Sequence, residues 1–236
     1  MSLFINQEDG YYSLTTTSIA LFIVIIAVLI LLTAFLKSSK NATEENETEK
    51  NNKNKNFSAK QLVFSAAAIA LGFITSYIKI IDMPWGGSVT LFSMLFVTLV
   101  GYWYGPKIGI SAGFAYGILQ FIQGGGGYIL SPLQACLDYI IAFAALGLSC
   151  FFNNKKNGLI KGYIFAIFMR GLFHTIGGYL YWMDYMPDSF PQALAAIYPI
   201  AYNYSYIIAE GMATVIVLML PPVKDAMARV KQLASE

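Results

Sequence analysis

The sequence predicts an all-helical protein embedded in a membrane. Of its 236 residues, 57% are hydrophobic and only 12% are charged, whereas soluble domains carry about 25% charged residues. Long apolar runs dominate, and several reach the roughly 20 residues that a helix needs to cross a bilayer. Strand-like alternation over ten-residue segments does not appear. The composition therefore excludes an ordinary soluble globular domain.

The first apolar run covers residues 18–36, "SIALFIVIIAVLILLTAFL". We expect residues 1–36 to form an N-terminal transmembrane helix whose N-terminus lies outside the cell. A cleaved signal peptide is the rival interpretation, but it would begin with basic residues, and this run follows Glu8 and Asp9 with no Lys or Arg before it. Residues 37–57 are rich in Asn, Glu and Lys and are predicted to be a disordered cytoplasmic linker.

Residues 58–236 are predicted to form a six-helix membrane domain with a cytoplasmic C-terminus. Its helical segments are expected at about 60–80, 89–104, 107–122, 132–152, 159–181 and 193–220. The second and third segments are short for a bilayer, so they are expected to tilt or to pack inside the bundle. The connections are short except at 81–88, 123–131 and 182–192.

The positions of Lys and Arg predict the orientation, because cytoplasmic loops carry an excess of these residues. They gather in the linker, in every second connection after it and at the C-terminus: Lys37, Lys40, Lys50, Lys53, Lys55, Lys60, Lys107, Lys155, Lys156, Lys161, Lys224, Arg229 and Lys231. The alternate connections, "DMPWGGS", "QGGGGYILSP" and "WMDYMPDSFP", contain no Lys or Arg. The chain is therefore expected to cross the membrane seven times.

Ionisable side chains inside a bilayer are costly and usually face a bundle interior, a partner or a ligand. Asp138 lies six residues after Pro132, roughly 9 Å below the outer surface at 1.5 Å per helical residue. His174 and Asn203 are expected at a similar depth on two other helices. The sequence thus predicts an acid, an imidazole and an amide at one level, with a buried structural acid as the alternative for Asp138.

Arg170 and Glu210 are expected about one helical turn deeper, and at matching depths. We predict a structural ion pair between them, because a lone buried charge is much less favourable than a pair. A proton or ion relay is the functional alternative.

Aromatic residues surround the outer level: Trp85, Tyr116, Tyr128, Tyr139, Tyr179, Tyr181, Trp182, Tyr185, Tyr198, Tyr202, Tyr204 and Tyr206. The usual belt of Trp and Tyr at the headgroups accounts for many of them, but not for the acid beside them. Aromatic faces with one carboxylate suit a flat, cationic, heteroaromatic ligand. The sequence therefore predicts a pocket for such a compound, open to the outside.

The sequence contains no motif for nucleotide binding or for a metal site. "GGGG" at 124–127 is not followed by Gly-Lys-Ser/Thr, so it is not a phosphate loop, and active transport would need an ATPase on another chain. The single His has no Cys or second His at ligand spacing, so no metal site is expected. Ala66 and Ala70 form a pair of small residues that allows close helix contact, either within the bundle or with a partner protein.

Four stretches resemble one known family: "PWGGSVTLFSM", "AYGILQFIQGGGGYILSPLQACLDYIIAFAALGL", "RGLFHTIGGYLYW" and "YPIAYNYSY". Over residues 58–222 the chain resembles the thiamine-specific substrate-binding subunit, or S component, of energy-coupling factor transporters. The resemblance implies a six-helix bundle in a bacterial plasma membrane that binds thiamine near its outer face. It implies no catalytic residues, no cofactor and no nucleic-acid partner.

The resemblance also assigns roles to residues. Asp138 would meet the cationic thiazolium and polar edge of thiamine. Tyr139, His174, Trp182, Tyr198 and Asn203 would line its rings, Trp85 and Tyr128 would close the pocket, and Tyr116 would lie in it. The face of Ala66 and Ala70 would dock onto a transmembrane scaffold protein coupled to two ATPases.

The chain departs from the family pattern at two points. The acidic position is associated with glutamate, whereas Asp138 is one methylene shorter, and residues 1–57 are additional. Three other functions stay open on the residues alone. One is an S component for another vitamin or aromatic solute, and another is an intramembrane enzyme that uses Asp138 and His174 as acid and base. The third is a purely structural scaffold that binds no specific small molecule.

Overall fold

The computed structural model describes residues 5–8, 11–14, 58–124 and 129–235. Near the N-terminus, strands β1 (Ile5–Glu8) and β2 (Tyr11–Leu14) pair antiparallel, with Ile5 opposite Leu14. The predicted helix at 18–36, the linker at 37–57 and the pocket residue Tyr128 lie outside the described residues.

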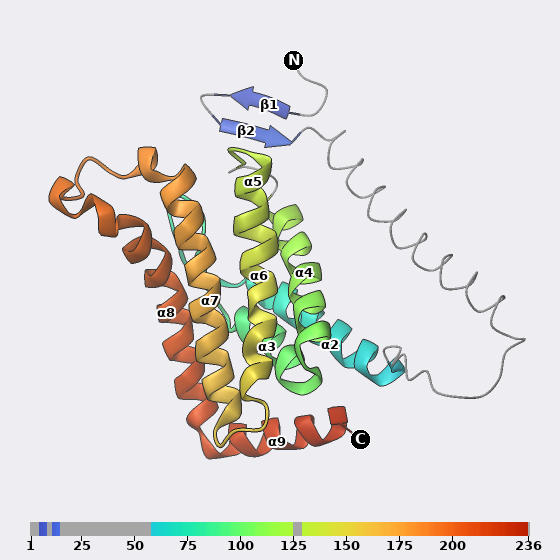
Figure 1. The fold of residues 1–236 in the computed structure, drawn as a ribbon. Coiled ribbons are helices and arrows are strands. Elements are labelled where there is room, and N and C mark those ends of the chain that lie inside the picture. The colour runs from blue at the N-terminus through green and yellow to red at the C-terminus, as the bar shows by residue number, and fades with distance from the viewer. Residues whose placement is uncertain (1–4, 9–10, 15–57, 125–128, 236) are drawn as a thin grey trace, which may run out of the picture.

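Each of the six segments predicted after the linker contains a helix (Figure 1). They are α2 (Ala59–Ser76), α3 (Ser93–Tyr104), α4 (Pro106–Gln123), a continuous rod at 132–152, α7 (Gly158–Tyr181) and α8 (Tyr198–Met219). The rod consists of α5 (Pro132–Ala135), the π-helix η1 (Cys136–Ile141), α6 (Ala142–Ala144) and the 3₁₀ helix η2 (Ala145–Phe152). Two short 3₁₀ helices, η3 (Met183–Tyr185) and η4 (Gln192–Ile197), connect α7 to α8. The predicted all-helical membrane fold is confirmed.

Local sequence signals explain where α2 and α4 begin. The Ser58 hydroxyl accepts a hydrogen bond from the Gln61 backbone at 3.1 Å, and the Gln61 side chain accepts one from the Ser58 backbone at 3.1 Å. This reciprocal capping satisfies two N–H groups that have no partner within the helix. Gly105, at φ 86°, allows the sharp turn between α3 and α4, and Pro106 occupies the first position of α4.

A β-hairpin replaces the ends of two predicted helices. Strands β3 (Lys79–Asp82) and β4 (Ser88–Thr90) pair antiparallel, so α2 ends at Ser76 and α3 begins at Ser93. Gly86 and Gly87 have φ values of 91° and 82° and form the turn. The apolar runs on either side read as helix by composition, because hydrophobicity alone does not separate a short strand from a helix end.

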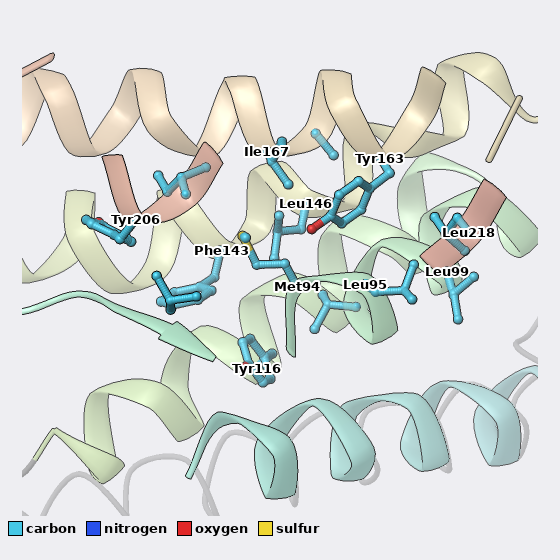
Figure 2. Packing of buried hydrophobic residues seen from close by; sticks show 14 residues of the cluster. Met94, Leu95, Leu99, Tyr116, Phe143, Leu146, Tyr163, Ile167, Tyr206 and Leu218 are labelled. Atoms are coloured by element: carbon cyan, nitrogen blue, oxygen red, sulfur yellow. The ribbon is translucent and has the colours of Figure 1, made fainter. Parts of the chain in front are cut away.

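The short helix α3 lies inside the bundle, as its length predicts. Met94 is 1% exposed, and Val97 and Val100 are fully buried. Figure 2 shows the side chains of this helix among residues of the rod and of α7, such as Leu146 and Tyr163. Glycines allow close packing here, because a Cβ on Gly101 of α3 would lie only 2.4 Å from the Gly147 carbonyl oxygen of the rod.

Helix α9 (Pro221–Ser235) is an element that the sequence analysis did not predict. It is bent by 88° from the preceding helical segment and crosses one end of the bundle (Figure 1). Val223 and Met227 pack against the core. The Lys231 ammonium donates to the Tyr102 hydroxyl at 3.2 Å and to the Asn153 carbonyl at 3.1 Å. These contacts tie α9 to the end that carries the basic connection at 153–157.

Three of the described helical segments are long and apolar enough to cross a membrane: 59–76, 132–152 and 158–181. The α8 and α9 pair makes a fourth if it counts as one bent span. Helix α3 has 12 residues, which is a length of roughly 18 Å. Fewer segments therefore qualify as spans by themselves than the six that the sequence predicts as helices.

Candidate ligand-binding site

A cavity of about 620 Å³ lies between the helices at the end of the bundle opposite α9. The hairpin, α2, α4, the rod, α7 and α8 all contribute to its wall. Eight of the nine predicted pocket residues line it: Trp85, Tyr116, Asp138, Tyr139, His174, Trp182, Tyr198 and Asn203. Its volume is in the range of small-molecule sites, about 300–1,000 Å³.

Asp138 lies on the π-helix η1 and faces the cavity, with 14% of its side chain exposed. Its Oδ2 accepts hydrogen bonds from Gln134 Nε2 at 2.6 Å and from Trp182 Nε1 at 3.2 Å. Single π-helical turns are rare and often occur at functional sites. Both donors are neutral, so they orient the carboxylate and leave its charge in place.

His174 connects Asp138 to Arg170. Its Nδ1 lies 3.4 Å from Asp138 Oδ1, and its Nε2 accepts from Arg170 Nε at 3.3 Å. Since an arginine N–H only donates, Nε2 is the unprotonated nitrogen and Nδ1 carries the proton. The imidazole in this arrangement is neutral, and it bridges a cation and an anion.

Two glycines bring α7 close to the polar groups. A Cβ on Gly177 would lie 2.7 Å from Asp138 Oδ1, and one on Gly178 would lie 2.8 Å from Pro199 Cβ. Asn203 Nδ2 donates to the His174 carbonyl at 3.2 Å. The acid, imidazole and amide that the sequence places at one depth are therefore neighbours in the structure.

Aromatic rings form the wall above this polar group. The ring centroids of Trp182 and Tyr185 are 5.2 Å apart, and those of Trp85 and Tyr185 are 5.8 Å apart. The ring centroids of Tyr198 and Tyr202 are also 5.8 Å apart. Tyr116 lies deeper, is 1% exposed and packs edge-on against Phe143 at 5.2 Å.

The predicted ion pair between Arg170 and Glu210 is wrong. In the part of the chain that the structure describes, no ion pair joins them. The Arg170 guanidinium lies 4.4 Å above the Phe143 ring, and Glu210 accepts hydrogen bonds from Thr90 at the end of β4 and Met94 at the start of α3. Matching depth was a sound inference, since both residues line the cavity, but depth does not fix the direction in which a side chain points around its helix.

The charged residues of the cavity wall carry a net negative charge. The wall contains three carboxylates, Asp82, Asp138 and Glu210, and two cations, Lys79 and Arg170, which gives a formal charge of −1. Lys79 and Asp82 pair with each other at 3.0 Å in an exposed position. The electrostatics therefore favour a cationic guest over an anionic one.

Sequence analysis missed several polar residues of the wall. Gln134, which is 1% exposed, precedes Asp138 by one helical turn on the same face, and that spacing could have identified it. Ser76, Gln120 and Gln123 form a hydrogen-bonded group between α2 and α4. Gln120 and Gln123 are polar residues near the end of an apolar helix, and this pattern could have identified them as residues of the cavity wall.

The two small residues predicted for docking, Ala66 and Ala70, are exposed on α2. Ala68 and Gly72 on the same helix are buried, and a Cβ on Gly72 would lie 3.2 Å from the Ser93 carbonyl oxygen. The small residues thus divide into one pair that packs within the bundle and one pair that faces outward.

Over residues 5–8, 11–14, 58–124 and 129–235, no cluster of three or more His, Cys, Asp or Glu side chains suits a metal ion.

The fold and the cavity together define a helical membrane protein with an internal polar and aromatic site near one end. A family model described as "Thiamine transporter protein" (Thia_YuaJ) matches residues 62–229. The chain belongs to this family, which is one of transporters rather than enzymes, and the protein is a multi-pass protein of the plasma membrane.

A curated relative is the thiamine transporter ThiT of Bacillus subtilis (strain 168). It is 32% identical over 171 residues, which cover 67% of this chain and 85% of that protein. A solved structure of ThiT from Listeria monocytogenes matches with a TM-score of 0.53 and 24% identity, covering 69% of this chain and 94% of that one. The structure of the S component of a bacterial ECF transporter matches with a TM-score of 0.48 and 20% identity, over 71% and 95% of the two chains. Of the two structures, the first supports the fold.

Proposed function

We propose that this protein binds thiamine in the cavity around Asp138 and acts as the substrate-binding membrane subunit of an energy-coupling factor importer. The observation that carries the proposal is a carboxylate held by neutral donors beneath aromatic rings, in a chain of the thiamine transporter family. Thiamine is a flat cation with two heteroaromatic rings. Stacking, cation–π contact and Coulomb attraction therefore act on the same guest.

In the proposed complex, charged, polar and aromatic residues would contact different parts of thiamine. Asp138 supplies the negative charge, and His174 and Asn203 offer polar edges beside it. Trp182 and Tyr198 offer flat surfaces for the rings, with Tyr139 and Tyr116 at the wall of the cavity. Trp85 on the hairpin, together with Tyr128, would cover the bound vitamin.

Transport requires partners that this chain does not supply. Its sequence contains no nucleotide-binding motif, so we propose that a transmembrane scaffold protein and two ATPase subunits provide the energy. The outward face of Ala66 and Ala70 on α2 would be the docking surface, because small residues let helices approach closely in a bilayer. In this arrangement residues 58–236 form the vitamin-binding domain, the linker and C-terminus are cytoplasmic, and the cavity opens outward.

Thermal unfolding of the purified full-length protein tests the ligand. Thiamine at one hundred times its Kd is expected to stabilise the folded state by about 2.7 kcal/mol, because it binds only that state. Riboflavin, biotin and tryptophan at the same concentration serve as controls. A melting temperature that responds to one of these and ignores thiamine would assign the site to another solute.

Mass spectrometry of the small molecules that copurify with the protein provides a second test. Recovery of chemically unchanged thiamine is expected from a transporter. Recovery of a converted product would instead indicate acid–base chemistry by Asp138 and His174, which lie within 3.4 Å of each other.

A further inference from the structure

Glu210 on α8 is buried, with 2% of the residue exposed, and the hydrogen bonds to its carboxylate come from the last residue of β4 and the first two residues of α3. Its Oε2 accepts from the backbone N–H of Thr90 at 2.8 Å and from the Thr90 hydroxyl at 2.7 Å. Its Oε1 accepts from the backbone N–H of Met94 at 3.2 Å and from the Ser93 hydroxyl at 3.5 Å. The Glu210 side chain therefore connects the end of β4 to the start of α3.

The start of α3 lacks an acceptor from its own capping residue. Phe92, which precedes the helix, has a left-handed backbone with φ 60° and makes no side-chain capping bond. The first N–H groups of a helix have no partner within it, and the positive end of the helix dipole favours a negative charge there. Glu210 therefore caps α3 from a different helix.

Glu210 is also the last member of a row on α8. Tyr202, Tyr206 and Glu210 recur every four residues and share one face of the helix. The Tyr202 hydroxyl accepts from the Trp85 backbone N–H at 2.8 Å. The Tyr206 ring packs so closely on the hairpin turn that a Cβ on Gly87 would lie 2.7 Å from it. The row holds the segment from Trp85 to Thr90 along α8.

We infer that Glu210 is a positioning residue that fixes the β3–β4 hairpin, and with it Trp85, over the cavity. The inference rests on the proposed function, in which Trp85 covers the bound vitamin. Glu210 acts through the hairpin and not through contact with the ligand charge. Its loss is therefore expected to change how long the ligand stays bound.

Hydrogen exchange of the ligand-free, full-length protein tests the anchor independently of what binds. Glu210→Gln keeps the shape of the side chain but turns an amide NH₂ toward a backbone N–H. Exchange at the amides of Thr90 and Met94 is expected to rise on the order of tenfold, since hydrogen bonds to a charged group are lost. Unchanged exchange at both amides overturns the inference.

Tyr163→Phe is the matched control for general destabilisation. It removes a buried hydroxyl that donates to Thr214 Oγ1 at 3.0 Å, a contact between α7 and α8 outside the cavity wall. Exchange at Thr90 and Met94 is expected to stay at the wild-type level in this variant. A rise equal to that of Glu210→Gln would show that any loss of core stability frees the hairpin, and would overturn the specific role of Glu210.

Release of radiolabelled thiamine after dilution tests the consequence. Glu210→Gln is expected to raise the dissociation rate on the order of tenfold while the association rate changes by less than about threefold. Tyr202→Phe, which removes another contact of the same row, is expected to change the rates in the same direction. If the Glu210 variant does not fold, the release rate of the Tyr202→Phe variant still tests the inference.

An uncharged thiazole analogue of thiamine separates the inference from direct binding. If Glu210 acts through the hairpin, the substitution accelerates release of thiamine and of the analogue by the same factor. An effect confined to the cation would show that Glu210 acts on the ligand charge, and would overturn the inference. Failure of the wild-type protein to bind thiamine would reject the proposed function, whereas the exchange result would stand.

Discussion

At the scale of single residues, the neighbours of Asp138 explain why an acid can occupy an apolar helix. Its donors, Gln134 and Trp182, are neutral, and Arg170 is linked to it through the imidazole of His174. The glycine at position 177 allows α7 to approach to within hydrogen-bonding range of the short side chain. Within residues 58–124 and 129–235, the carboxylate is therefore ordered without a directly bound Lys or Arg, which is the condition for attracting a cationic guest.

Asp138→Asn tests the role of this charge. The substitution preserves size and removes the negative charge, so thiamine affinity is expected to fall by about 30-fold, or about 2 kcal/mol, since the cation loses its buried partner. Isothermal titration calorimetry measures the change. Asp184→Asn is the control, because Asp184 is exposed and lies outside the cavity wall, and its affinity should match the wild type. Equal affinity of all three proteins would mean that Asp138 is a structural acid.

At the scale of elements, α2 has two faces with different tasks. Gly72 and Ala68 pack against the bundle, whereas Ala66 and Ala70 face outward beside apolar side chains such as Leu62 and Val63, which are 65% and 63% exposed. Outward apolar side chains suit lipid, and small ones also suit close contact with another helix. The proposed docking face and the proposed ligand site therefore consist of different residues.

The double substitution Ala66→Leu and Ala70→Leu tests the docking face. It is expected to abolish assembly with the scaffold and ATPase subunits, because the larger side chains keep the helices apart, and to leave thiamine affinity within about twofold. Copurification of the complex and a thiamine titration measure the two effects. Ala213→Leu on α8 makes one change of the same kind at another exposed position and should assemble normally. Normal assembly of the double variant would exclude this face.

At the scale of the whole molecule, the cavity and the basic connections occupy opposite ends of the bundle. Lys231 on α9 holds Tyr102 and Asn153 together at one end, while the hairpin and the aromatic rings enclose the cavity at the other. The orientation predicted from the distribution of Lys and Arg would place the cavity at the outer end. The family match begins at residue 62, after the first predicted span and the linker.

Removal of residues 1–57 tests the proposed domain boundary. The capping box at Ser58 and Gln61 starts α2 locally, and every described residue of the cavity wall follows it. The shortened protein, expressed with a new initiating Met, is therefore expected to fold in the membrane and bind thiamine within about twofold of the full chain, since it keeps every described residue of the cavity wall. A large loss of affinity measured by titration would assign residues 1–57 to the binding domain.

The sequence was sufficient for the features that depend on position along a helix. Apolar length and basic connections predicted the six helical segments, and counting residues from the outer ends placed Asp138, His174 and Asn203 at one level. Polar side chains at equal depth on neighbouring helices can meet in the interior of the bundle, and the structure brings these three together. Eight of the nine predicted pocket residues line the cavity, but several of them, including Trp85 and Tyr116, were predicted from the family resemblance and not from depth. The ninth, Tyr128, lies outside the described residues.

Only the tertiary structure decided what depends on the rotation of each helix and on neighbours distant in sequence. Glu210 points to the start of α3 and Arg170 to Phe143, so their matching depths did not make an ion pair. The hairpin forms because β3 and β4 pair with each other across the turn at Gly86 and Gly87, and α9 turns across the bundle because its apolar side chains meet the core there. Depth is a one-dimensional property that residue spacing encodes directly, whereas the choice of partner is made by packing among all the helices at once.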